Sequence, residues 1–258
     1  MPKPDLHDLR VLVTRPSHQA QAFIDKLQSA GAQTTEFPCI DIHYEQSLSD
    51  TDIDRALDSD LLIFTSPNAV TGAIHCQLFD NPRFTNEETS APALAAIGQA
   101  TRKSLRNHQL KVSIAPAENT DSEGFVKHFS DAIMPGSNIT IVRGRHGRNV
   151  LKQKLESLGA NVSYLSVYDQ VLPPVNETDA RNILLAALPC VISITSDMSL
   201  ENLLQLSPLD IHGQILASPL VVNSQRCAQL AKQKGFTGPM LVATPPGDHG
   251  QFQVLSTL

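Results

Sequence analysis

Ile139-Thr-Ile-Val-Arg-Gly-Arg-His-Gly-Arg148 decides the fold, because it is the second copy of a pattern that opens the chain at Val11-Leu-Val-Thr-Arg-Pro16. In each copy a short β-branched run leads into a cationic turn and then into a helical pattern. Each run is long enough for a buried strand and too short for a helix. A turn that joins a strand to a helix N-terminus suits an anion. The pair therefore predicts a duplicated α/β unit with a ligand between the copies.

The ends of further predicted strands recur at almost the same spacing. Val11 and Ile139 are separated by 128 positions, and Ser66 and Ser196 by 130. Strands that alternate with helices predict parallel sheets flanked by helices. Ligands bind beyond the carboxyl ends of such strands. The residues expected at these ends are Arg15, Ser66, Gly98, Arg143, Ser196 and Asn223.

Composition excludes several classes of function. The chain has 258 residues and a net charge of −6, which argues against a nucleic-acid-binding protein. No apolar run approaches the roughly 20 residues of a membrane span, and the first residues lack a signal-peptide core, so we expect a cytoplasmic protein. The four cysteines and nine histidines show no zinc-binding spacing, and no metal is expected.

Two segments with alternating polar and apolar residues, 38–46 and 161–173, are interpreted as connector strands that pair as a two-stranded β-ladder. The first α/β domain would then be discontinuous, with residues 1–37 plus 174–258, and the second would span 47–160. This division explains why the chain is expected to run extended over so many residues after Thr34. The alternative is two contiguous halves, 1–130 and 131–258.

Short motifs along nearly the whole chain resemble those of the uroporphyrinogen-III synthase family, in the family's order. They are Val-Thr-Arg-Pro at 13–16, Phe-Thr-Ser-Pro-Asn-Ala-Val at 64–70, Ala-Ile-Gly-Gln-Ala-Thr at 96–101, Ser-Glu-Gly-Phe at 122–125, Val-Arg-Gly…Gly-Arg at 142–148, Gly-Ala-Asn-Val…Val-Tyr at 159–168 and Thr-Ser…Leu-Glu-Asn-Leu at 195–203. Each motif is weak alone, and their number and order carry the resemblance. One departure is Asn223-Ser-Gln-Arg226, where many members have Gly with Thr or Ser.

The resemblance implies two α/β domains joined by a β-ladder, with the active site in the cleft between them. It also implies that the linear tetrapyrrole hydroxymethylbilane is cyclised to uroporphyrinogen III with loss of water and inversion of ring D, and that no cofactor takes part. We expect a monomer that meets the upstream hydroxymethylbilane synthase at most transiently.

Such a substrate carries eight carboxylates, so an acidic protein needs local cations, hydroxyls and helix N-termini to bind it. Each candidate has a plainer alternative, because an arginine can be a solvated surface cation and a serine or threonine can simply cap a helix. The candidate substrate-binding residues are Arg15, Ser66, Gly98, Thr101, Arg143, Gly144, Arg148, Ser196, Ser224 and Arg226.

Tyr168 is the candidate catalytic residue. It matches the tyrosine of the family's Val-Tyr motif, and a phenol can donate the proton that the leaving hydroxyl needs. The alternative is an aromatic side chain that only packs in the ladder. At the level of function, the rival interpretation is a cytoplasmic two-domain protein that binds a small anion without catalysis. A nucleotide-binding enzyme is not supported, because the sequence has neither a G-x-G-x-x-G nor a Walker A loop.

Overall fold

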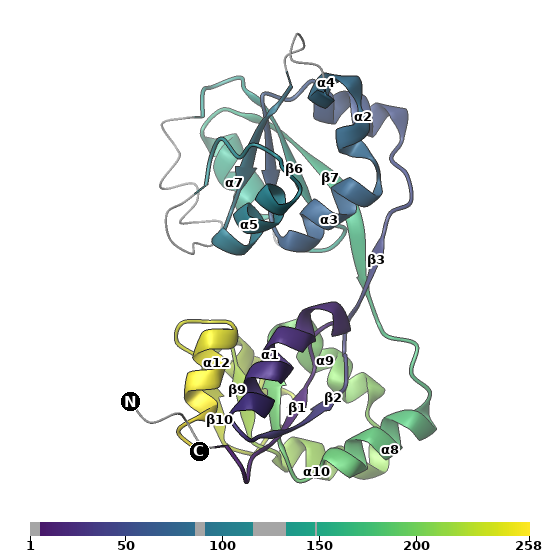
Figure 1. Ribbon diagram of the computed structural model, residues 1–258, viewed down its shortest axis with the longest axis vertical. Helices are drawn as coiled ribbons and strands as arrows, with labels where there is room; N and C mark the ends of the chain where they lie inside the picture. The colour runs from purple at the N-terminus through teal and green to yellow at the C-terminus, as the bar shows by residue number, and fades with distance from the viewer. Residues whose placement is uncertain (1–5, 86–90, 116–132, 148) are drawn as a thin grey trace. The chain divides into compact units, whose positions relative to one another are not determined.

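The computed structural model describes residues 6–85, 91–115, 133–147 and 149–258. The chain divides into two compact units (Figure 1). Unit 1 comprises Met1–Asp41 together with Val171–Leu258, and unit 2 comprises Ile42–Gln170. Each unit contains a largely parallel sheet flanked by helices, which confirms the predicted α/β class.

The sheet of unit 1 has the strand order β10-β9-β8-β1-β2, and every neighbouring pair is parallel. Its strands are β1 (Arg10–Val13), β2 (Gln33–Glu36), β8 (Val191–Ile194), β9 (Leu220–Val222) and β10 (Met240–Val242). Both faces are covered, so consecutive residues of β1 and β8 are buried, Ser193 among them. Leu12 packs in the same core as α8, α9, α10 and α11, whereas Val11 and Val13 pack with α1 and α12.

The helices of unit 1 follow the sequence pattern closely. Its helical elements are α1 (Ser17–Ser29), α8 (Glu177–Ala187), α9 (Asp197–Leu206), η3 (Leu209–Ile211), α10 (His212–Ala217), α11 (Gln225–Gln233) and α12 (Asp248–Leu255). In α1 the residues at helical spacing, Ala20, Phe23, Ile24 and Leu27, are the buried ones. The chain leaves this helix through Gly31, whose φ of +97° suits glycine.

The sheet of unit 2 has the strand order β3-β7-β6-β4-β5. Its strands are β3 (Asp41–Tyr44), β4 (Leu61–Phe64), β5 (Ala93–Ala96), β6 (Asn138–Gly144) and β7 (Asn161–Val171). Its described helical elements are α2 (Asp50–Leu57), α3 (Pro67–His75), η1 (Leu78–Asp80), α4 (Pro82–Thr85), α5 (Gln99–Asn107) and α7 (Val150–Ser157). Leu151 and Leu155 of α7 pack on one face of the sheet. On α3, a Cβ added to Gly72 would lie 2.6 Å from the carbonyl oxygen of Val167 in β7.

Four strands of the two sheets correspond: β1 to β6, β2 to β7, β8 to β4 and β9 to β5. In unit 1 β1 lies between β8 and β2, and in unit 2 β6 lies between β4 and β7. The registers match as well, because Val11 pairs with Thr34 and Ile139 pairs with Val162, each 128 positions later. In the described residues, Ile114 makes a single parallel bridge to Ala95 at the far side of β5.

The segment predicted as the second connector strand differs from expectation. Asn161–Ser166 pairs in parallel with Asn138–Arg143 and is therefore part of the sheet of unit 2. Val162 and Tyr164 pack against the cluster that contains Leu151 and Leu155, whereas Leu165 is buried outside that cluster. The other connector segment, β3, lies beside β7 in the same sheet. Unit 2 is thus longer at both ends than the predicted range of 47–160.

Candidate active site

The carboxyl edge of the sheet in unit 2 gathers several of the predicted residues. Ser66 and Gly98 follow the parallel strands β4 and β5, and Arg143 and Gly144 end β6. Tyr168 lies near the end of β7 and pairs with Gly144. Because the strands β4 to β7 are parallel, these residues meet at one edge of the sheet.

Tyr168 owes its position to an irregularity in β7. Arg143 pairs with Ser166 but Gly144 pairs with Tyr168, so Val167 is an extra residue in the ladder. A bulge of this kind redirects the side chain that follows it. The Tyr168 side chain is buried, and its hydroxyl lies 3.2 Å from the Ser66 hydroxyl.

Gly144 and Ser66 bracket the phenol of Tyr168. A Cβ on Gly144 would lie 2.7 Å from Cε2 and Cζ of the ring, so the absence of a side chain there allows the ring its position. Ser66 is the N-cap of α3, where its Oγ accepts a hydrogen bond from the Ala69 N–H at 3.1 Å. The Ser66 hydroxyl therefore serves both the helix and the phenol.

Sequence reasoning missed Tyr44, which contributes a second phenol to this edge. Its ring stands edge-on to that of Tyr168 with 6.4 Å between the centroids, and it stacks on His75 at 5.8 Å. Its hydroxyl donates to Oδ1 of Asn68 at 3.4 Å. Burial raises the pKa of Tyr44 above 10.0, with the nearby Tyr168 adding to the rise and a hydrogen bond with Thr71 opposing it. Tyr44 ends the alternating run before α2, and nothing in that run distinguishes a site residue.

Arg143 lines a cavity of about 160 Å³ beside Tyr168. Its guanidinium lies 4.7 Å from the centre of the Tyr164 ring, and its Nε donates to the Gly144 carbonyl at 3.0 Å. Gly147 closes the turn with a φ of +145°, and a Cβ there would lie 2.2 Å from Nη2 of Arg143. The cavity thus joins a buried cation to the phenol. It is lined by Thr65, Ile141, Arg143, Gly144, His146, Gly147, Leu151, Tyr164 and Tyr168.

Two other predicted residues of unit 2 lie on α5. Gly98 is its N-cap, with an extended φ of −138°, and Thr101 is a buried residue of its first turn. Gly98 thus presents backbone at the helix start, whereas the Thr101 side chain packs inward. Arg148, also predicted to bind substrate, lies outside the described residues.

In unit 1, Arg15 is buried rather than presented to solvent. Its Nη1 pairs with Oδ1 of Asp248, the first residue of α12, and its Cζ lies 4.3 Å from the centre of the Phe23 ring. Within the part of the chain that the structure describes, its Nε and Nη2 are buried without a hydrogen-bond partner. The Asp248 side chain remains 48% exposed. A carboxylate that binds Nη1 of Arg15 therefore has to compete with Asp248.

The remaining candidates in unit 1 begin helices. Ser196 caps α9 by accepting from the Ser199 N–H at 3.1 Å, and Ser224 caps α11 by accepting from the Cys227 N–H at 3.2 Å. Arg226 is mostly exposed and pairs with Oδ2 of Asp197 at 2.5 Å. All three lie at the carboxyl edge of the sheet of unit 1, as predicted from the strand ends.

The departure at Asn223 has a structural explanation. Its Oδ1 accepts from the Gly247 N–H and from Nε2 of the fully buried Gln251, both at 3.0 Å. Its Nδ2 donates to the Thr195 carbonyl at 3.3 Å. These bonds fasten the start of α12 to the ends of β8 and β9, and α12 in turn carries the Asp248 that pairs with Arg15.

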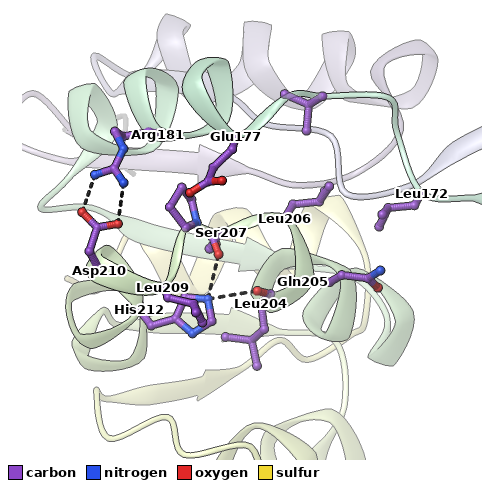
Figure 2. A pocket seen from close by; sticks show the side chains of 12 residues that line it. Leu172, Glu177, Arg181, Leu204, Gln205, Leu206, Ser207, Leu209, Asp210 and His212 are labelled. Atoms are coloured by element: carbon purple, nitrogen blue, oxygen red, sulfur yellow. Dashed lines mark hydrogen bonds and ion pairs between the residues drawn. The ribbon is translucent and has the colours of Figure 1, made fainter.

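A cavity of about 840 Å³ lies in unit 1 and contains none of the predicted site residues (Figure 2). Its polar groups bind one another. Arg181 pairs with Asp210, and Nε2 of His212 lies 3.0 Å and 2.8 Å from the carbonyls of Leu204 and Ser207. Glu177 is the remaining acidic residue of the lining, and none of the residues assigned to substrate binding or catalysis lies there.

The four thiols and the potential metal ligands add no further candidate to the site among the described residues. Cys39, Cys76, Cys190 and Cys227 are buried and free, and burial raises the pKa of each thiol, which suppresses the reactive thiolate. In the described ranges, His, Cys, Asp and Glu residues form no group of three or more that could hold a metal. None of the helices in those ranges is long and apolar enough to cross a membrane.

A family model described as Uroporphyrinogen-III synthase HemD matches residues 21–246. The chain belongs to the uroporphyrinogen-III synthase family. The match confirms the family resemblance of the motifs and assigns the chain to tetrapyrrole biosynthesis.

Relatives and solved structures of this family cover most of the chain. The uroporphyrinogen-III synthase of Escherichia coli is 27% identical over 234 residues, which are 88% of this chain and 92% of that protein. That of Synechococcus elongatus is 31% identical over 199 residues, or 76% of this chain and 74% of that protein. The crystal structure of uroporphyrinogen-III synthetase from Helicobacter pylori matches with a TM-score of 0.65 at 16% identity, and covers 96% of this chain and 99% of that chain. At this identity the structure supports the shared fold alone.

Proposed function

We propose that this protein is a lyase that converts hydroxymethylbilane into uroporphyrinogen III, with loss of water and inversion of ring D. Family membership supports the reaction. The observation that carries the assignment to residues is the buried phenol of Tyr168, which lies 3.2 Å from the Ser66 hydroxyl beside the Arg143 cavity. A proton donor and a buried cation thus lie together at the carboxyl edge of one sheet.

Tyr168 acts as the proton donor in the proposed first step. The electron-rich pyrrole of the substrate expels its hydroxyl, the C–O bond breaks, and the phenol proton leaves with that oxygen as water. The cation that remains is attacked by ring D at its substituted carbon. This attack gives a spiro intermediate, in which the bond from the substituted carbon to the methylene shared with ring C then breaks. The methylene cation that is released is attacked by the unsubstituted carbon of ring D, which inverts the ring. The hydrogen on that carbon is lost as a proton when ring D becomes aromatic again, and the phenolate takes it up. The reaction releases only water and moves no electrons to an acceptor, so we propose that no cofactor is required.

Binding of the substrate carboxylates is proposed to use strand-end residues in both units. In unit 2 we assign it to the buried Arg143 and to the backbone at Gly144 and Gly98. In unit 1 we assign it to Arg226 and to Arg15, both of which have an acidic partner with which a carboxylate must compete. The remaining proposed contacts are Ser66, Thr101, Arg148, Ser196 and Ser224.

Control of the product is the second part of the proposal. Without a protein to hold the chain, the reactive cation closes directly to the symmetric isomer. Binding several carboxylates at fixed positions orients ring D for attack at the substituted carbon, so orientation supplies much of the effect. We further propose that the protein acts as a monomer and receives its unstable substrate from the upstream synthase through transient contact.

The test is an assay with freshly generated hydroxymethylbilane that scores isomer III against isomer I. The wild-type protein is expected to form isomer III, and Tyr168→Phe is expected to form it about 10-fold to 100-fold more slowly, as for loss of one proton donor. A wild-type protein that binds the substrate but leaves the spontaneous isomer ratio unchanged would show an anion-binding protein instead. A Tyr168→Phe variant with full activity would remove the phenol from the mechanism.

A further inference from the structure

Ser66 makes a contact that a helix cap alone does not require. Its Oγ accepts the Ala69 N–H at 3.1 Å and also lies 3.2 Å from the Tyr168 hydroxyl. Among the serine N-caps in the described ranges, Ser66 is the one that also contacts a tyrosine; the others are Ser49, Ser196 and Ser224. The second contact therefore calls for an explanation beyond capping.

The capping bond uses an acceptor site of the Ser66 oxygen and leaves its proton for donation elsewhere. The phenol oxygen of Tyr168 is within reach of that proton. When Tyr168 has given up its own proton it becomes an anion, and hydrogen bonds to anions are the strong ones. The Ser66 hydroxyl then stabilises the phenolate that proton donation creates.

The helix that begins after Ser66 adds to the same effect. Helix α3 has nine residues, starts at Pro67, and has no acidic residue in its first turn. The N-terminus of a helix carries a partial positive charge that favours a nearby anion. The Tyr168 oxygen lies beside the residue that caps this terminus. The serine and the helix thus act on one atom.

We propose that Ser66 is a positioning residue that prepares Tyr168 as the proton donor, by holding its hydroxyl and by donating to the phenolate. This inference rests on the proposed role of Tyr168 in the reaction. It replaces a mainly substrate-binding role for Ser66 with one exerted through another side chain.

The test compares Ser66→Gly with a matched control, Ser49→Gly. Glycine is tolerated at an N-cap, so both variants are expected to fold. Ser49 caps α2 in the same unit by accepting the Asp52 N–H at 3.2 Å, and it is outside the proposed site. We expect Ser66→Gly to lower kcat about 10-fold with KM changed less than about 2-fold. Ser49→Gly should retain wild-type kcat.

A double mutant separates action through Tyr168 from independent action. If Ser66 works through the phenol, Ser66→Gly slows the wild-type enzyme but does not slow Tyr168→Phe further. An equal loss in both backgrounds, with Tyr168→Phe itself slow, would overturn the inference for Ser66 and leave the proposed function standing. A fully active Tyr168→Phe would overturn the proposed function, and the catalytic role of Ser66 with it.

Spectroscopy supplies a readout that does not depend on activity. The chain has three tyrosines and no tryptophan, so [¹³Cζ]tyrosine labelling gives a spectrum of three signals in which Tyr168 is assigned with Tyr168→Phe. We expect Ser66→Gly to move the Tyr168 signal, because that carbon bears the oxygen in the contact, and Ser49→Gly to leave it in place. An unmoved signal in Ser66→Gly would show that the hydroxyls do not interact.

Discussion

The ring of Tyr168 occupies the space that a side chain at position 144 would fill, and the residue there is glycine. A Cβ on Gly144 would lie 2.7 Å from two ring atoms of Tyr168 and 3.1 Å from its hydroxyl oxygen. These distances are too short for a carbon–carbon contact, and the ring is buried, so the ring has to shift if Gly144 changes. The position of the proposed proton donor therefore depends on the absence of one methyl group in the neighbouring strand.

Gly144→Ala is accordingly expected to lower kcat about 10-fold to 100-fold, because a displacement of about 1 Å can cost that much in rate. The measurement is the initial rate of isomer III formation, with KM determined in parallel. Gly213→Ala is the control, since nothing lies within 4 Å of a Cβ at Gly213. Equal rates for both alanine variants would mean that the position of the ring is unimportant.

Asp248 is expected to compete with a substrate carboxylate for the guanidinium of Arg15. If Arg15 binds a carboxylate of hydroxymethylbilane, that carboxylate must compete with Asp248, so Asp248→Asn is expected to lower KM about 3-fold to 10-fold. Asp210→Asn is the control, because Asp210 pairs with Arg181 in the same unit outside the proposed site. A lower melting temperature with an unchanged KM would identify the Arg15–Asp248 pair as purely structural.

The turn after β6 packs closely against Arg143 at Gly147. A Cβ at Gly147 would lie 2.2 Å from Nη2 of Arg143, so Gly147→Ala is expected to displace the guanidinium and raise KM about 10-fold. Gly136 also has a positive φ, +86°, but nothing lies within 4 Å of a Cβ there. Gly136→Ala therefore introduces backbone strain without a side-chain collision. A similar KM in the two variants would argue against a binding role for Arg143.

The buried thiols and the half-buried phenol of Tyr44 predict a loss of stability in alkali. Burial raises the pKa of Cys190 from 9.0 to about 11 and raises that of Cys39 as well, so the unfolded chain loses these protons first. Stability from a group with a raised pKa is complete below the unfolded value and is lost as the pH rises toward the folded value. Each such group contributes about 1.4 kcal/mol per pH unit in that window.

Urea unfolding between pH 7 and pH 11 is the measurement for these groups. The free energy of unfolding is expected to decline from about pH 9 upward for the thiols, and from about pH 10 for Tyr44, whose pKa is also raised by burial. Cys39→Ala should make the decline shallower, since the variant lacks one group that ionises only on unfolding. An identical decline in the variant would mean that Cys39 ionises equally in both states.

The α/β architecture could be predicted from the sequence, because the strand segments of the two repeats share their composition and recur at nearly constant spacing. The buried runs at β1, β4, β6 and β8 are short, apolar and followed by turn residues, and their length favours strands over helices. The two segments predicted to pair are neighbours, as β3 and β7, but Asn161–Ser166 also pairs with β6. Alternation could not reveal this second partner, because it describes any strand whose two faces differ. It does not say whether the neighbouring strand belongs to a sheet or to a two-stranded ladder.

The sequence was enough to predict which edge of the sheet carries the candidate site. It was not enough to predict which side chains touch one another there. Parallel strands bring Ser66, Gly144 and Tyr168 to the same edge, and this follows from their places at strand ends. That Ser66 contacts Tyr168 depends on the bulge at Val167, which leaves no mark in the sequence. The inward turn of Arg15 depends on Asp248, more than two hundred residues away, and no local pattern reveals it.

The order of the strands sets the order in which this chain can fold. Unit 2 is one continuous stretch, Ile42–Gln170, whereas β1 waits for β8, which begins at Val191. During synthesis from the N-terminus, unit 2 can complete its core while the first forty residues still lack most of their partners. Unit 2 can therefore fold before the two segments of unit 1 have come together. Truncations near the C-terminus should accordingly leave unit 2 folded and prevent unit 1 from folding.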